Sequence, residues 1–357
     1  MRMNKFCTLL LLLPLALTCR AHTLPGAATP QQVDEILDHL SESLNDYVFP
    51  ETAAELKRQL QAKRSEYRVI TDPKALATRL TDDLRAVGHD KHLEVSYGDD
   101  MGFAKDPTPE ELRRAHTLDA GRGFGVRSAR RLPGNIGYID LAYFSGDPEA
   151  GAAIAAAMQI IHGTDALILD LRRNGGGGPA STVLLSYFFA EPTQLSSVVE
   201  RKDGQDRERQ KWTMPYVPGG PYPGKAVFVL TSHHTWSAAE LCAYDLKTRK
   251  RATLVGEVTG GAANSSSGLI SLGYGFAALI PNGQTRSPIT HTSWEGTGVE
   301  PDVATNASEA LIVAYKLALK DATNSGELEE LTKERQLALQ DPQAALAEEI
   351  TGFPKKQ

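Results

Sequence analysis

The chain has 357 residues, of which 41% are hydrophobic, and it carries a formal net charge of −6. This length and composition allow a large hydrophobic core and favour two domains. The acidic charge gives no support for binding nucleic acid or anionic lipid, so we expect no nucleic-acid partner.

The first 21 residues are typical of a secretory signal peptide. Two basic residues precede an apolar run over residues 9–17, and the small residues Cys19 and Ala21 suit cleavage after Ala21. The run is too short to span a bilayer, so we expect an exported, periplasmic or extracellular protein without stable membrane insertion after cleavage. A buried N-terminal helix is one alternative. Lipidation of Cys19 is another, although Thr18 stands where a lipoprotein signal usually has Gly or Ala.

Cleavage would change both the charge and the thiol content of the chain. The signal segment holds three of the 38 basic residues and none of the 44 acidic residues, so 35 basic residues remain and the net charge becomes −9. It also holds Cys7 and Cys19, which leaves Cys242 as a single thiol. One thiol cannot form an internal disulfide, so an ordinary hydrophobic core must hold the fold together.

Helical periodicity marks residues 22–98, which we interpret as an N-terminal helical domain. Apolar residues at helical spacing predict helices over residues 31–40, 53–60 and 72–87. Residues 99–122 are polar and rich in turn formers, and we interpret them as a connector.

Strands and helices alternate over residues 123–320, which we interpret as the catalytic domain. Continuous apolar strands between helices predict an α/β fold with a largely parallel sheet covered by flanking helices. Hairpin-like strands are expected near residues 269–280, and residues 321–357 form a C-terminal helix and tail. The expected strands are 135–141, 166–172, 226–231 and 253–257, and the expected helices are 148–161, 180–189, 237–250, 307–319 and 326–350.

A glycine-rich segment, Asp170-Leu-Arg-Arg-Asn-Gly-Gly-Gly-Gly178, follows one of the buried strands. Its exposed backbone N–H groups suit a negative oxygen near a helix N-terminus. Part of it also resembles a dinucleotide-binding fingerprint, but Pro179 opens the helix and no Gly-Lys-Ser/Thr follows. A flexible turn is the third possibility.

A second candidate is Ser237, which follows an apolar strand and opens a helix in Thr231-Ser-His-His-Thr-Trp-Ser-Ala-Ala-Glu240. Such a turn holds the serine hydroxyl at the carboxyl edge of the sheet, and the Ala238 N–H is then free to bind a developing oxyanion. Serine is also a common helix N-cap, which is the competing structural explanation.

A nucleophilic serine needs a base. His92 lies in Asp90-Lys-His-Leu-Glu-Val95, at the end of the helical region, while His233 and His234 are the alternatives nearest Ser237 in sequence. Glu295 lies beside Trp294 in a glycine-punctuated loop, where it orients a base or simply forms part of a turn.

Taken in this order, the segments resemble the tail-specific, or C-terminal processing, serine protease family, and in particular its branch with tricorn core protease and the interphotoreceptor retinoid-binding protein. The likeness covers most of the chain, from Asp34 to about Leu319. It is carried by Asn45-Asp-Tyr-Val-Phe-Pro, Asp90-Lys-His-Leu, Asn135-Ile-Gly-Tyr-Ile, Leu169-Asp-Leu-Arg with its Asn-Gly-Gly-Gly, the Ser237 segment, Gly256-Glu-Val-Thr-Gly-Gly and Trp294-Glu-Gly-Thr-Gly-Val-Glu-Pro-Asp.

The resemblance implies a crotonase-like fold and assigns roles to single residues. Ser237 matches the nucleophile, His92 the base and Glu295 the acid of the tricorn-like branch. Ala262 stands where the Ser–Lys branch has its lysine, and Lys91 stands where relatives often have a serine. Residues 99–133 are too few for the PDZ domain that many relatives carry.

The implied activity is hydrolysis of peptide bonds in peptides or proteins. The N–H of Ala238 and one from Gly175 or Gly176 would hold the oxyanion. The rival hypothesis is a non-catalytic protein that binds an apolar ligand, because retinoid-binding relatives share the fold. We expect no cofactor and no metal, since the sequence has no His-Glu-x-x-His motif and no cysteine pair remains after cleavage.

Overall fold

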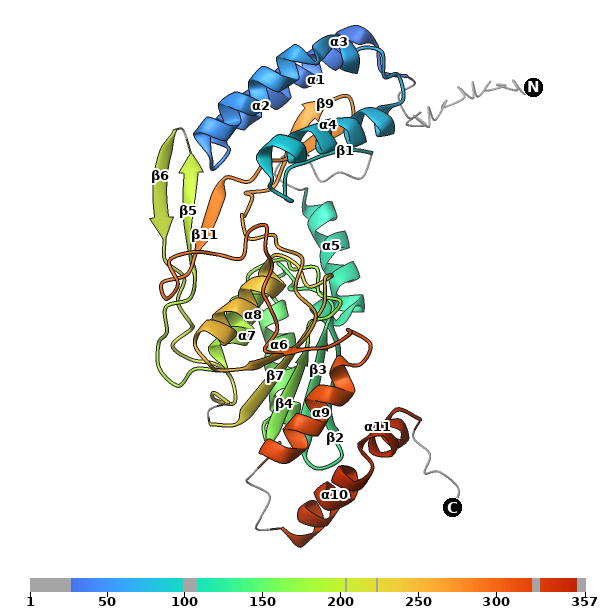
Figure 1. Cartoon of the computed structure of the whole chain (residues 1–357), viewed down its shortest axis with the longest axis vertical. Coiled ribbons are helices and arrows are strands. Elements are labelled where there is room, and N and C mark those ends of the chain that lie inside the picture. The colour runs from blue at the N-terminus through green and yellow to red at the C-terminus, as the bar shows by residue number, and fades with distance from the viewer. Residues whose placement is uncertain (1–26, 99–107, 203, 223, 323–327, 352–357) are drawn as a thin grey trace, which may run out of the picture.

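The computed structural model describes residues 27–98, 108–202, 204–222, 224–322 and 328–351. The predicted signal peptide over residues 1–21 therefore lies outside the described residues. Figure 1 shows an elongated molecule, with an upper lobe of helices and a small sheet above a larger α/β lobe. None of the described helices is long and apolar enough to cross a membrane.

The upper lobe contains the predicted N-terminal helices, which are confirmed. Each of its three long helices has a proline in its first turn, where the missing N–H costs nothing, and Thr29 forms a capping box with Gln32. Its elements are α1 (Pro30–Ser43), the short 3₁₀ helix η1 (Leu44–Asp46), α2 (Pro50–Ala62), α3 (Arg64–Tyr67), α4 (Pro73–Gly88) and β1 (Glu94–Tyr97).

A hairpin from late in the chain completes the upper lobe. Strand β10 (Phe276–Leu279) pairs antiparallel with both β1 and β9 (Leu269–Gly273). Leu272 and Phe276 join one hydrophobic core with Ile36 and Leu80. The hairpin expected near residues 269–280 is thus present, and it packs on the N-terminal helices rather than on the large sheet.

The lower lobe is built on a six-stranded sheet of order β12-β8-β7-β4-β3-β2. All neighbouring strands in it run parallel except β2 and β3. The strands are β2 (Val126–Leu132), β3 (Ile136–Leu141), β4 (Ala166–Asp170), β7 (Ala226–Thr231), β8 (Thr253–Gly256) and β12 (Val303–Ala304).

Helices cover both faces of this sheet, as the continuous apolar strands predicted. Because successive side chains of a strand point to opposite faces, Leu167 and Leu169 pack with the helices of one face, and Ile168 packs with those of the other. The first face carries α6 (Ala150–Ile161), α7 (Ala180–Ser186) and α8 (Ala238–Thr248). The second carries α9 (Ala310–Asp321), against which α10 (Glu329–Gln340) and α11 (Pro342–Thr351) pack.

A small antiparallel sheet of order β11-β5-β6 extends from the side of the lower lobe up to the level of α2 in the upper lobe (Figure 1). It consists of β5 (Ser197–Lys202), β6 (Gln205–Arg209) and β11 (Gly283–Arg286). These strands were not predicted from the sequence. Every residue of β6 is exposed, so this strand lacks the apolar alternation that marks a half-buried strand.

The segment interpreted as a connector, residues 99–122, contains a helix in its second half that the sequence did not predict. Helix α5 (Pro109–Gly121) begins with a capping box between Thr108 and Glu111 and leads into the 3₁₀ helix η2 (Gly123–Gly125). No residue of α5 is buried, so it has no apolar stripe. Polar contacts hold it instead: Asp119 accepts hydrogen bonds from Tyr143 and Ser145.

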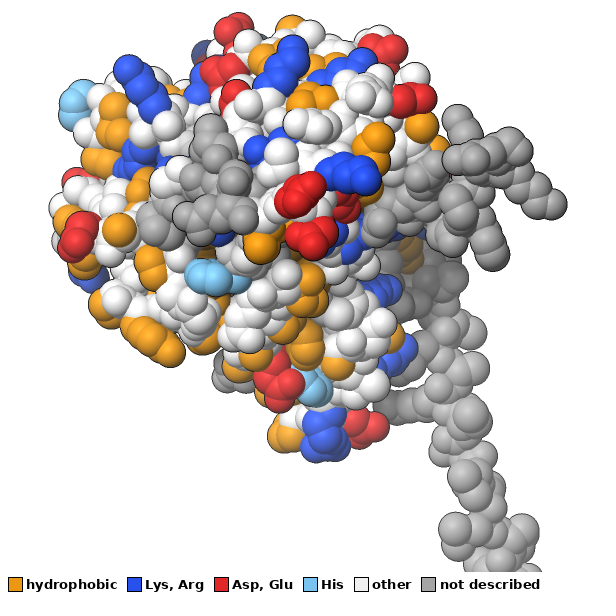
Figure 2. Space-filling model, turned by 90° about the horizontal axis from the view of Figure 1, so that it is seen from below, with side chains coloured by type: hydrophobic (Ala, Val, Ile, Leu, Met, Phe, Trp, Pro, Cys, Tyr) orange, Lys and Arg blue, Asp and Glu red, His pale blue; other side chains and the backbone are white. Residues whose placement is uncertain are grey.

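The lower end of the molecule has a surface of mixed charge. In the view from below, Lys and Arg side chains lie between Asp and Glu side chains, and neither sign forms a continuous field on this face (Figure 2).

Candidate active site

Three of the predicted segments meet at the carboxyl edge of the large sheet. The glycine-rich segment follows β4, the Ser237 turn follows β7, and the loop over residues 257–264 follows β8. Parallel strands end at the same edge of a sheet, which is where α/β proteins generally place their ligands. The loop after β3 joins them, since Phe144 donates its N–H to the carbonyl of Gly176 at 2.8 Å.

Ser237 has an uncommon backbone conformation at the start of α8. Its φ is 52° and its ψ is −116°, a region that non-glycine residues rarely occupy. The turn is anchored on the glycine-rich segment, because Trp236 donates its N–H to the carbonyl of Asn174 at 3.0 Å. Such strain persists only where the surroundings enforce it, and it is common at functional sites.

The close packing beside Ser237 explains why residue 176 of the glycine-rich segment is a glycine. A Cβ atom on Gly176, whose φ is +90°, would lie 2.8 Å from Cβ of Ser237 and 2.9 Å from the nitrogen of Ala238. The Gly176 N–H donates to Oδ1 of the buried Asn174 at 2.9 Å, so this N–H is already engaged. Gly176 therefore allows the two loops to approach each other.

The other two predicted oxyanion donors are less engaged. Gly175 makes only a long contact of 3.4 Å to the carbonyl of Ala142, and a Cβ added to it would meet nothing within 4 Å. No described residue accepts a hydrogen bond from the Ala238 N–H, as expected in the first turn of a helix.

His92 lies on the turn between α4 and β1 and faces the Ser237 turn. Its backbone N–H donates to Oδ1 of the buried Asp90 at 2.9 Å. The imidazole packs against the ring of Trp236, the residue before Ser237, with ring centroids 5.9 Å apart in an edge-to-face arrangement. Burial lowers the pKa of the imidazole, an effect that the charge of Asp90 partly opposes.

Glu295, about 200 residues after His92 in the sequence, lies close to the His92 side chain. Its Oε2 accepts the N–H groups of Ala263 at 2.6 Å and Asn264 at 2.9 Å. One side-chain atom each from Asp90, His92 and Glu295 lie within 4.8 Å of one another. Burial raises the pKa of the Glu295 carboxyl, and repulsion from Asp90 raises it further.

Two buried atoms in this cluster could form a hydrogen bond with each other. Nδ1 of His92 and Oε1 of Glu295 are both buried, and neither has a hydrogen-bond partner among the described residues. A protonated ring nitrogen donates to a carboxylate oxygen, so one bond between them, direct or through one water, would satisfy both.

Comparison with known proteins now identifies the family. The model of peptidase family S41 matches residues 135–305, and the model of the N-terminal domain of that family in eukaryotic IRBP matches residues 27–118. The chain belongs to peptidase family S41. The resemblance inferred from the sequence is thereby confirmed.

Individual S41 relatives are distant. The chain is 29% identical over 180 residues to carboxyl-terminal-processing peptidase 2, chloroplastic, of Arabidopsis thaliana, covering 48% of this chain and 33% of the relative. It is 30% identical over 169 residues to the carboxyl-terminal-processing protease of Synechocystis, covering 47% of this chain and 37% of the relative. The chain thus spans little more than a third of the length of these curated relatives.

Solved structures share the S41 fold at low identity. A putative peptidase from Parabacteroides merdae matches with a TM-score of 0.53 and 20% identity, covering 78% of this chain and 90% of that structure. A lipoprotein from Streptococcus agalactiae matches with a TM-score of 0.53 and 19% identity, covering 84% of this chain and 99% of that structure.

The alternative histidines, and two charged residues beside His92 in sequence, have other contacts in this S41 chain. The exposed His233 bonds Glu257 at 3.0 Å through Nδ1, and the ring of His234 packs against it. The exposed Glu94 pairs with Arg85. Lys91 donates its ammonium group to the carbonyl of Gly260 and lies 5.9 Å from the ring centroid of Trp236.

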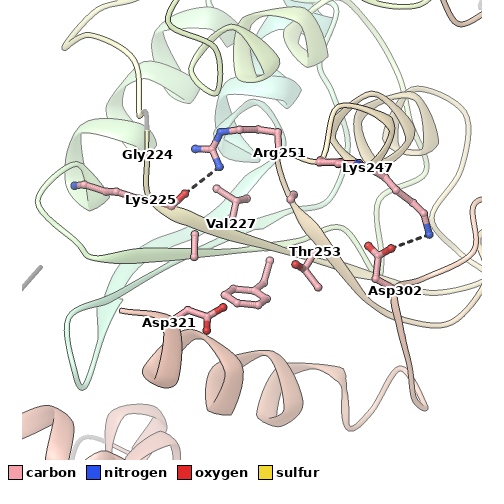
Figure 3. A pocket seen from close by; sticks show the side chains of 12 residues that line it. Gly224, Lys225, Val227, Lys247, Arg251, Thr253, Asp302 and Asp321 are labelled. Carbon is pink, nitrogen blue, oxygen red and sulfur yellow. Dashed lines mark hydrogen bonds and ion pairs between the residues drawn. The ribbon is translucent and has the colours of Figure 1, made fainter. Parts of the chain in front are cut away.

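A cavity of about 600 Å³ lies at the opposite edge of the sheet, where β7 and β8 begin (Figure 3). Two of its cationic groups have contacts within the fold. Arg251 donates to the carbonyls of Lys225, Phe188 and Tyr222, and Lys247 pairs with Asp302 at 3.0 Å. The cavity is therefore separate from the cluster around Ser237.

Sequence reasoning missed residues that support the cluster, chiefly Asp90 and Asn264. The Asp90-x-His92 spacing was a usable signal, because an aspartate two residues before a turn position commonly accepts the backbone N–H there. Asn264 donates its amide to Oδ2 of Asp90 at 2.9 Å, a contact across 174 residues that no local pattern reveals.

The two histidines with shifted pKa values should titrate on opposite sides of the ordinary value of about 6.5. We expect His92 to titrate below it, because burial disfavours the imidazolium, and the half-buried His116 to titrate above it, because Asp147 stabilises its charged form. An NMR titration of the ring resonances, assigned with His92→Ala and His116→Ala, measures both. A His92 midpoint at or above that of His116 would contradict the buried environment described above.

Proposed function

We propose that this S41 chain is a serine peptidase with Ser237 as nucleophile, His92 as base and Glu295 as the group that orients the base. The observation that carries the proposal is convergence. His92 packs against Trp236, the residue before Ser237, and the loop over residues 259–264 contacts both the Ser237 turn and Glu295. Bringing such distant segments together costs chain entropy, so an accidental meeting of these three residue types would be unusual.

In the proposed reaction, His92 takes the proton of the Ser237 hydroxyl as its oxygen attacks the peptide carbonyl. Glu295 stabilises the imidazolium, and the N–H groups of Ala238 and Gly175 stabilise the oxyanion. His92 then protonates the departing amine, and a water molecule hydrolyses the acyl-enzyme by the same route. Lys91 is a poorer base, since its ammonium group is exposed and already donates to Gly260.

Peptides or proteins outside the cytoplasm are the proposed substrates. The basic and apolar start of the chain supports export by a signal peptide cleaved after Ala21. The curated relatives are named for processing the carboxyl termini of proteins. A non-catalytic role in binding an apolar ligand is the weaker alternative, because it gives no reason for serine, histidine and glutamate to be retained together.

The nucleophile is tested by covalent labelling. A fluorophosphonate probe should label the wild-type protein, and Ser237→Ala should abolish both labelling and peptide hydrolysis without loss of folding, because the hydroxyl contributes little to the core. Ser267→Ala, which alters an exposed serine of another loop, is the matched control and should label normally. Labelling of Ser237→Ala at the wild-type rate would refute the assignment.

Glu295→Gln tests the orienting carboxylate. The change keeps the shape and removes the charge that stabilises the imidazolium, so kcat should fall on the order of 10²-fold while KM changes little. Glu300→Gln, at an exposed position in the same loop, should leave both constants unchanged. Equal effects of the two substitutions would mean that Glu295 has a structural role only.

Chelation tests the absence of a metal requirement. One histidine and two carboxylates within 4.8 Å also form a plausible set of metal ligands, so a metal requirement is a possibility that chelation can exclude. We expect EDTA to leave hydrolysis unchanged, because the proposed steps use only protein groups and the oxygens of Asp90 already accept hydrogen bonds. Loss of activity with EDTA that added zinc restores would overturn this part of the proposal.

A further inference from the structure

Glu240 is a fully buried carboxylate in the first turn of α8, three residues after Ser237. Its Oε2 accepts the N–H of Ser237 at 2.9 Å and the N–H of Ala262 at 2.9 Å. Its Oε1 accepts the hydroxyl of Thr259 and the N–H of Gly261, both at 2.6 Å. Four donors therefore surround one carboxylate.

The partners of Glu240 are all uncharged, although burying a carboxylate is costly. Burial raises the pKa of Glu240, and the hydrogen bonds from Thr259, Ala262, Gly261 and Ser237 oppose that shift. Its charge also raises the pKa of Glu295. An unpaired buried charge next to the second carboxylate of the site is poorly explained by stability alone.

The donors of Glu240 come from the Ser237 turn and from the loop over residues 259–262, and the proposed reaction requires a fixed position of one relative to the other. Ser237 keeps its strained φ of 52° while its N–H is bound to Glu240. Gly261 and Ala262 are followed directly by Ala263 and Asn264, whose N–H groups bind Glu295. The carboxylate thus ties the nucleophile turn to the loop that carries the contacts of Glu295.

We infer that Glu240 is a positioning residue for the peptidase reaction, which fixes the strained Ser237 turn against the loop over residues 259–262 and so sets the nucleophile relative to its base. This inference rests on the proposed function. Glutamine at position 240 would turn an NH₂ group toward N–H donors at one of the two oxygens, which loosens the turn without changing its volume.

The test separates positioning from stability by comparing two buried carboxylates on α8. Asp245 is also fully buried, but it binds Ser196 and Arg249 rather than the site. For Glu240→Gln and Asp245→Asn we would measure the Tm, kcat, KM and the fluorophosphonate labelling rate per folded molecule. We expect Glu240→Gln to lower kcat and the labelling rate by about tenfold or more at nearly constant KM. Asp245→Asn should lower Tm but leave the labelling rate near that of wild type.

A second pair of variants keeps the inference testable if Glu240→Gln does not fold. Thr259→Val removes one donor to Glu240, and also the acceptor of the Val299 N–H, while keeping the side-chain shape, whereas Thr259→Ser retains the hydroxyl and both contacts. We expect the serine variant to react like wild type and the valine variant to react several-fold more slowly.

Two results would overturn the inference alone: Glu240→Gln labelling like wild type, or, if it does not fold, Thr259→Val labelling like Thr259→Ser. Failure of the wild-type protein itself to label at Ser237 would instead refute the proposed function, and this inference with it.

Discussion

Four consecutive backbone N–H groups, those of residues 261–264, are shared between two carboxylates, the buried Glu240 and the half-buried Glu295. The first two donate to Glu240 and the last two to Glu295. A carboxylate taken from water into a protein interior must recover its hydrogen bonds there, so neither glutamate can shift without leaving donors or charge unsatisfied. The loop therefore sets the spacing between the nucleophile turn and the acid. The side-chain amide of Asn264, in the same loop, donates to Asp90, and Asp90 in turn accepts the backbone N–H of His92.

The large sheet makes this arrangement possible. Its parallel strands are buried on both faces, and their carboxyl ends deliver the glycine-rich segment, the Ser237 turn and the loop after β8 to one edge. The base is not part of the sheet. It comes from the upper lobe, whose core includes the hairpin of β9 and β10, and residues 263–264, which bind Glu295, precede that hairpin closely in the chain. The two lobes thus meet at the candidate site itself.

The sequence predicted what depends on local patterns. The apolar runs before Asp170 and Ser237 predicted buried strands, and their positions located the loops that carry chemistry. The sequence did not reveal α5, because a helix without buried residues has no apolar stripe, although the capping box at Thr108 and Glu111 was visible. It also did not reveal the supports of the site. Contacts such as Asn264 with Asp90 join residues far apart in the chain, and only packing of the whole fold brings them together.

Whether His92 and Ser237 act as one unit can be seen in a crystal structure of the protein after reaction with a fluorophosphonate. We expect a phosphonyl group on Oγ of Ser237, with Nε2 of His92 within hydrogen-bond reach of Oγ, about 2.6–3.2 Å. The phosphonyl oxygen should accept the N–H of Ala238, and Glu295 should bond Nδ1 of His92 directly or through one water. An adduct on another residue, or an imidazole turned away while a different base contacts Ser237, would contradict the account.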